Sequence, residues 1–164
     1  MIIKNNKLYL KIGSLGWVNF YGIPSFITGI GVIAMILGLL RDSDLKVLTF
    51  YVLIILGGII LCVYQNNKLK FKSQDLSIPT DIFIEKAKKI LINEGWTIEY
   101  DNNEYLQAIN RTGQFRLDLL TIKRFKQKIK YNLVHHPEDN NSIASLIDLN
   151  LKAKKTIVKL IACT

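Results

Sequence analysis

The segment from Thr121 to His136, TIKRFKQKIKYNLVHH, has the clearest chemical potential in this 164-residue chain. Five basic residues occupy the eight positions that begin at Lys123: Lys123, Arg124, Lys126, Lys128 and Lys130. In one extended strand, four of them would share a face, whereas a turn near Phe125 would gather them at a hairpin tip. Either arrangement is dense enough for contacts with phosphate groups. The run is therefore the candidate binding surface, and a solvated hairpin tip is the alternative.

Three kinds of partner fit such a surface: anionic lipid, an acidic protein surface and nucleic acid. Anionic lipid is favoured for a domain tethered beside a membrane, where each basic residue contributes about 1 kcal/mol. Nucleic acid is the least expected partner, because only Phe125 and Tyr131 supply aromatic rings for base stacking near the run.

His135 and His136 do not form a metal site by themselves. Adjacent residues of a strand point to opposite faces, so the two imidazoles cannot chelate one ion together. They are also the only histidines in the chain. We expect a half-buried His135 and an exposed His136 at a strand end, and we expect no metal and no cofactor.

Signatures of catalysis are lacking as well. The chain has no G-x-S-x-G motif, and Cys62 and Cys163 are predicted to be free thiols in a reducing compartment. Several carboxylates near predicted turns are attributed to surface solubility: Glu99, Asp101, Glu104 and Asp118. We therefore expect no catalytic residue and a protein that is not an enzyme, with a small hydrolase that uses an unrecognised site as a remaining alternative.

Two long uncharged segments precede the polar half of the chain. No charged residue occurs from Ile12 to Leu40 or from Val47 to Asn67, and only RDSDLK separates the two apolar stretches. As a helix, the 18 residues Val47 to Tyr64 would span about 27 Å, close to the bilayer's hydrocarbon thickness of about 30 Å. Neither stretch has the polar face of a soluble helix. The pattern predicts a transmembrane helical hairpin over residues 17–64.

The positions of Lys and Arg predict the orientation of this hairpin. The loop between the spans has only Arg41 and Lys46, fewer than each flank. The flanking lysines are Lys4, Lys7, Lys11, Lys68, Lys70 and Lys72. Because the more basic side of a span stays in the cytoplasm, both termini are predicted to be cytoplasmic.

Small residues within the spans could support close helix packing. Those singled out are Gly31, Ala34, Gly38, Gly57 and Gly58. Either the hairpin packs on itself through them, or they form a docking face for a partner's membrane helix or for a second copy. Neither span contains an ionisable acidic, basic or imidazole side chain, so an ion pathway built by this chain alone is not expected.

The polar half predicts a small α+β domain at residues 78–164, after a linker at 65–77. A helix begins at Pro79 with Thr80 as its cap and ends at Gly95. Four strands follow, with Trp96, Ile98 and Tyr100 alternating on one face of the first. We predict a four-stranded antiparallel meander flanked by helices, a short extended piece near residues 143–148, and a closing helix over NLKAKKTIVKLIA. Residues 1–16 lie along the membrane interface or add a strand to the domain, and the interface is favoured.

The order of two spans, a Lys-rich linker and IEKAKKILINEGWTIEYDNNEYLQAI resembles uncharacterised bacterial membrane proteins with two transmembrane helices and a small cytoplasmic α+β domain. The resemblance implies this architecture in a bacterial inner membrane and implies no activity. Our leading functional hypothesis is a non-catalytic protein-binding module, an accessory subunit of a membrane assembly that binds a partner protein or forms a homo-oligomer. The alternative is a tether or sensor that binds an anionic ligand through residues 123–130.

Overall fold

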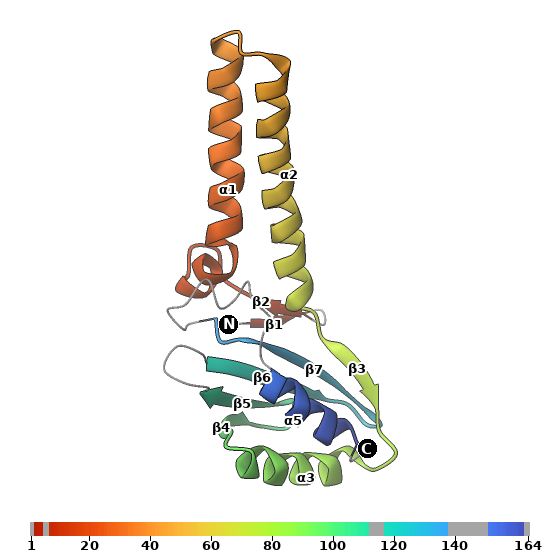
Figure 1. The fold of residues 1–164 in the computed structure, drawn as a ribbon. Helices are drawn as coiled ribbons and strands as arrows, with labels where there is room; N and C mark the ends of the chain where they lie inside the picture. Colours follow the sequence, from red (N-terminus) through yellow and green to blue (C-terminus); the bar gives the residue numbers. More distant parts are fainter. Residues whose placement is uncertain (1, 5–6, 112–116, 138–150, 163–164) are drawn as a thin grey trace.

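The computed structural model of the chain describes residues 2–4, 7–111, 117–137 and 151–162. Helices α1 (Leu15–Leu40) and α2 (Leu45–Lys68) form an antiparallel hairpin that projects from a small domain of β-sheet and helices (Figure 1). The α+β class predicted from the sequence is confirmed. The first and last described segments both lie at the domain end of the hairpin (Figure 1).

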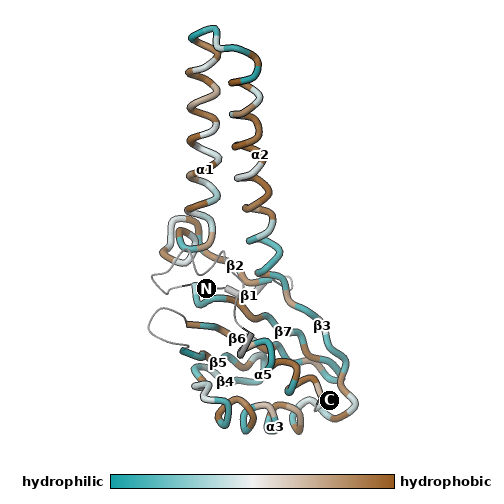
Figure 2. The backbone as a smooth tube through the Cα atoms, in the orientation of Figure 1, coloured by the Kyte–Doolittle hydropathy of each residue, from teal (hydrophilic) through white to brown (hydrophobic). Residues whose placement is uncertain are grey.

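The surface of the hairpin is apolar and exposed. Phe26 is 68% exposed and Ile60 is 66% exposed, although a helix in a soluble core would bury such side chains. Hydrophilic residues gather in the loop between α1 and α2 and at the domain end of α2 (Figure 2). Both helices are long and apolar enough to cross a membrane.

Three glycines lie where α1 and α2 touch. A Cβ atom on Gly58 would collide with the Thr28 hydroxyl oxygen and lie 2.9 Å from the Thr28 backbone nitrogen. Gly31 and Gly38 are similarly close to side chains of α2, among them Ile55 and Tyr51. All three glycines are buried, so they allow the backbones of this hairpin to approach each other.

The other two small residues lie differently. A Cβ atom on Gly57 would meet nothing within 4 Å. Ala34 is half-buried. Of the four predicted packing glycines, Gly57 is therefore the one with open space beside its Cα atom.

The sheet has five strands rather than the four predicted. Its order is β3-β7-β6-β5-β4, and all neighbours are antiparallel. The strands are β3 (Lys72–Asp75), β4 (Thr97–Asp101), β5 (Tyr105–Arg111), β6 (Leu117–Arg124) and β7 (Lys128–His135). The unpredicted strand, β3, comes from the segment expected to be a linker. The sequence of β3, KSQD, has no alternating apolar residues to predict a strand. An edge strand does not need them, because it pairs through its backbone and leaves most side chains in water.

Strand β4 also differs from its prediction. A β-bulge between Ile98 and Tyr100 shifts the register, so Tyr100 is exposed and stacks on Tyr105 with ring centroids 5.0 Å apart. Trp96 and Ile98 contribute to the core, as their alternation predicted. The extra residue of a bulge moves the next side chain to the other face.

Helices α3 (Thr80–Asn93) and α5 (Leu151–Ile161) cover one face of the sheet (Figure 1). Buried residues of the sheet, of both helices and of the link between α3 and β4 form the main core: Phe83, Ile84, Ala87, Leu91, Trp96, Leu106, Ala108, Leu120, Ile122, Ile129, Ala153, Ile157 and Leu160. Thr80 is not the cap of α3, because Pro79 holds that position and the Thr80 hydroxyl donates to the backbone oxygens of Phe125 and Lys126. It ties the start of α3 to the turn between β6 and β7.

The opposite face packs against the base of the helical hairpin. A second core joins residues of α1, the sheet and the N-terminal segment: Leu8, Phe20, Leu69, Leu119 and Val134. Strands β1 (Ile2–Lys4) and β2 (Lys7–Tyr9) form a separate two-stranded sheet here, and the Leu8 backbone nitrogen donates to Leu69 at 3.0 Å. The segment therefore packs on the domain through Leu8, which is 0% exposed, while its position along the membrane interface stays a prediction.

The first prediction concerns the α1–α2 contact. Gly58→Ala should leave the chain about 1–3 kcal/mol less stable than Gly57→Ala, since only the methyl group added at position 58 would overpack against Thr28. Both variants gain similar intrinsic helix propensity, which makes them a matched pair. Thermal unfolding in detergent, followed by far-UV circular dichroism, measures the difference. Equal midpoints would contradict the close contact.

The second prediction concerns the N-terminal strand. Leu8→Ala should lower the free energy of unfolding by about 2–5 kcal/mol, because it empties a fully buried site. Ile12→Ala is the control, since Ile12 is exposed and should change stability by less than about 0.5 kcal/mol. Chemical denaturation followed by tryptophan fluorescence tests both. If Leu8→Ala lowered the free energy of unfolding as little as Ile12→Ala, the packing of this segment on the domain would be contradicted.

Candidate functional site

The basic run forms a hairpin tip rather than one extended strand. Strand β6 ends at Arg124, β7 begins at Lys128, and the Phe125 backbone nitrogen donates to Lys128 at 3.1 Å. The predicted turn near Phe125 is therefore the arrangement observed. Antiparallel pairing places Lys123 directly opposite Lys130.

Three of the five predicted basic residues surround one aromatic ring. The Nζ atoms of Lys123, Lys128 and Lys130 lie 5.8, 5.8 and 5.2 Å from the centroid of the Phe125 ring. Like charges directly opposite each other are unfavourable, and the negative face of the ring offsets part of this repulsion. We call Lys123, Lys128 and Lys130 the lysine cluster.

The other two basic residues lie outside this cluster. The Arg124 guanidinium pairs with the Asp101 carboxylate, which also accepts from Lys88 Nζ at 2.6 Å. The hydrogen bond that Lys88 donates to Asp101, with a further one to Glu85, raises the pKa of Lys88. Arg124 thus belongs to an ion-pair network at the end of the sheet, and Lys126 is exposed in the turn.

The lysine cluster lies on the face of the sheet from which the helical hairpin rises. Side chains alternate along a strand, so Lys130 shares its face with Val134, and Lys123 shares its face with Leu119. Leu119 and Val134 pack against Phe20 and Leu69 at the base of the hairpin. Four residues along a strand correspond to about 13 Å, which separates the cluster from this contact.

A second basic surface was not predicted from the sequence. A groove of about 440 Å³ lies where the end of α2, the β7 edge and α5 meet. Its lining includes four lysines, Lys68, Lys70, Lys72 and Lys154. The remaining lining residues are Tyr64, Asn67, Tyr131, Asn132, Leu133, Ile157, Val158 and Ile161, so no described residue of the lining is acidic. We call this the basic groove.

The backbone beside the groove is held by one amide side chain. Asn132 Nδ2 donates to the backbone oxygens of Lys68 and Lys70, each at 2.7 Å. On the wall of the groove, burial raises the pKa of Tyr131. Lys68 Nζ lies 4.5 Å from the centroid of the Tyr64 ring, one helical turn earlier in α2.

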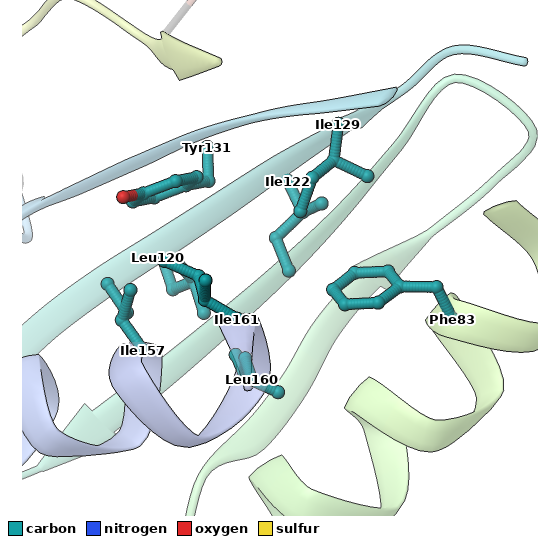
Figure 3. Close-up of a pocket in the computed structure, with 8 residues that line it drawn as sticks. All are labelled: Phe83, Leu120, Ile122, Ile129, Tyr131, Ile157, Leu160 and Ile161. Carbon is teal, nitrogen blue, oxygen red and sulfur yellow. The ribbon is translucent and has the colours of Figure 1, made fainter. Parts of the chain in front are cut away.

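A cavity between the sheet and its covering helices is not a ligand site. Figure 3 shows its lining, with Phe83 on α3, three residues on α5 and four on the sheet. Its volume is about 10 Å³, room for at most one water molecule, and the lining offers that water few polar groups. Tyr131, Ile157 and Ile161 also line the basic groove, so the groove is backed by the hydrophobic core.

Three buried polar residues lie side by side on β5, β6 and β7, at the end of the sheet opposite the lysine cluster. Asn110 is opposite Asp118, and Asp118 is opposite His135. Asp118 is 1% exposed, so its assignment to the solvated surface was wrong, and His135 is buried rather than half-buried. Asp118 was misjudged because both faces of β6 are covered, which alternation along one strand does not reveal. Glu99, Asp101 and Glu104 are exposed as expected.

The remaining candidate residues that the structure describes lie outside both basic surfaces. His136 is partly exposed, and its backbone nitrogen donates to Leu117 at 2.7 Å. Cys62 is a half-buried free thiol of α2, while Cys163 and residues 143–148 lie outside the described residues. Across the part of the chain that the structure describes, no three His, Cys, Asp or Glu side chains are grouped to hold a metal ion.

Comparison with known proteins found no family model, no curated protein and no solved structure that matches this chain. The resemblance drawn from the sequence pattern therefore stays a prediction, and functional inference rests on the two basic surfaces.

The third prediction tests the aromatic centre of the lysine cluster. Phe125→Leu should lower stability by about 1 kcal/mol, because the lysines lose the ring face that offsets their repulsion. In a chain that already has Lys123→Gln and Lys130→Gln, Phe125→Leu should lower the stability by clearly less. Denaturation at low salt measures both steps of this cycle. Identical costs in the two backgrounds would assign the effect to packing alone.

Proposed function

We propose that this chain is a membrane-anchored binding module whose α+β domain binds anionic groups at the membrane surface. In this proposal, α1 and α2 span a bacterial inner membrane, and both termini are cytoplasmic. The exposed apolar surface of both helices supports the insertion, because exposure of these side chains to water is unfavourable and the bilayer would cover them. Lysines at the domain end of α2 support the orientation.

One observation carries the binding function. The lysine cluster shares its sheet face with Leu119 and Val134, the residues that pack against the base of the helical hairpin. If the helices cross the bilayer, this face looks toward the headgroups. The negative potential of a cytoplasmic leaflet falls off over a Debye length of about 8–10 Å, and the cluster lies about 13 Å along the strands from the base of the hairpin, so this binding requires the sheet to lie along the membrane surface.

The accessory-subunit hypothesis has less support from the geometry. Gly31, Gly38 and Gly58 are used inside the hairpin, so among the glycines of α1 and α2 only Gly29 and Gly57 would leave an added Cβ atom without a neighbour within 4 Å. A protein partner or a second copy remains a prediction that binding experiments can address. No feature of the described residues favours the small-hydrolase alternative over either binding function.

The fourth prediction concerns lysine accessibility in the full chain. In phosphatidylcholine nanodiscs, Lys128 and Lys130 should react readily with a water-soluble acetylating reagent. Inclusion of phosphatidylglycerol should slow both reactions severalfold, and high salt should restore them, because screening weakens headgroup contacts. Mass spectrometry of the labelled peptides gives the rates.

Lys86 and Lys89 provide internal controls for this measurement. Both are exposed on α3, which covers the opposite face of the sheet, so their rates should not depend on anionic lipid. Equal rates at Lys130 with and without phosphatidylglycerol would overturn the proposed function. Equal slowing at Lys86 would indicate a general change in reagent concentration near the charged surface.

A further inference from the structure

We propose that the basic groove binds the headgroup of one anionic phospholipid from the leaflet around the domain end of α2. This inference rests on the proposed membrane placement and names a specific site within it. The groove is separate from the lysine cluster: none of Lys123, Lys128 and Lys130 is among its lining residues.

The charge of the groove selects an anionic occupant. Four lysines reach it from separate parts of the chain: Lys68 from the end of α2, Lys70 from the segment after it, Lys72 from the start of β3, and Lys154 from α5. No carboxylate is among its described lining residues, so the lysines impose a positive potential. Ammonium groups donate up to three hydrogen bonds each, which suits the phosphate of a headgroup. A zwitterionic headgroup would bring a cation of its own into this field.

The depth of the groove matches the level of lipid phosphates. Tyr64 lines its upper part, and a tyrosine ring at a helix end favours the interface between hydrocarbon and water. Lys68 lies four residues later, about 6 Å further along the helix axis. The groove therefore opens where the apolar surface of α2 ends.

The walls of the groove favour an amphiphile over a free anion. Ile157, Val158 and Ile161 line it from α5, and Val158 is 66% exposed. Free phosphate would leave this apolar wall in water, whereas the glycerol and first acyl carbons of a lipid would cover it. The volume of about 440 Å³ falls within the roughly 300–1,000 Å³ typical of ligand pockets, which suits one headgroup.

Native mass spectrometry of the full chain in detergent tests this site. With phosphatidylglycerol added, the wild-type chain should retain one lipid, and with phosphatidylcholine it should retain none under the same conditions. Lys70→Gln/Lys72→Gln should weaken retention by about thirtyfold, from the contribution of each basic residue near anionic lipid. Both side chains are exposed, so the fold should be preserved, which an unchanged unfolding midpoint would verify. The matched control is Lys86→Gln/Lys89→Gln, which should retain the lipid.

Two further measurements distinguish a phospholipid from a free anion as the occupant of the basic groove. Val158→Ser should weaken retention of phosphatidylglycerol, and excess inorganic phosphate should fail to displace the lipid. Displacement by inorganic phosphate, retention of phosphatidylcholine as strong as that of phosphatidylglycerol, or full retention by Lys70→Gln/Lys72→Gln would each overturn the groove assignment.

The acetylation experiment separates this proposal from the proposed function. In Lys70→Gln/Lys72→Gln, protection of Lys128 and Lys130 by phosphatidylglycerol should persist, because the lysine cluster is intact. If Lys70→Gln/Lys72→Gln kept both the protection of Lys128 and Lys130 and full retention of phosphatidylglycerol, only the groove proposal would be overturned. Loss of lipid retention without any protection of the lysine cluster in the wild-type chain would sink the proposed role of that cluster and leave the groove in place.

Discussion

The contact between the helical hairpin and the sheet is the constraint on which the rest of the structure depends. Phe20 and Leu69, at the base of the hairpin, are buried against Leu119 and Val134 of the sheet. Two side chains strengthen this contact by hydrogen bonds: Asn19 Nδ2 donates to the Pro137 backbone oxygen at 2.9 Å, and Asn132 Nδ2 donates to the backbone oxygens of Lys68 and Lys70. Because apolar burial and buried hydrogen bonds act together here, the sheet has a defined orientation relative to the helices.

That orientation fixes where the two basic surfaces lie relative to the hairpin. The lysine cluster lies on the hairpin side of the sheet, and the basic groove opens beside the last turn of α2. In the proposed placement, both would meet the same leaflet at separate points. Several weak electrostatic contacts on one rigid body add to each other, since binding at one surface holds the other close to its ligand. The anchored domain would thereby keep a fixed face toward the bilayer.

The central strand β6 has buried polar residues because both faces of the sheet are covered. Alternation along β6 predicts one apolar and one polar face, yet Asp118, Thr121 and Ile122 are all buried. The N-terminal segment and α1 cover the face that a small α+β domain commonly leaves in water. Polar residues on this strand are therefore part of the interior, where they require partners and restrict the register of the sheet.

Local patterns of the sequence determined much of this protein: the two apolar helices, the existence of α3 and the positions of β4 to β7, since periodicity and turn residues act over short distances. Edge strand β3 escaped this reasoning because backbone pairing requires no apolar pattern. Burial of Leu8 and Asp118 depends on what covers them from distant parts of the chain. The same holds for the basic groove, whose Lys70 and Lys154 are far apart in sequence. Only the tertiary structure decided which charges meet, because a charged surface is defined by distances in space.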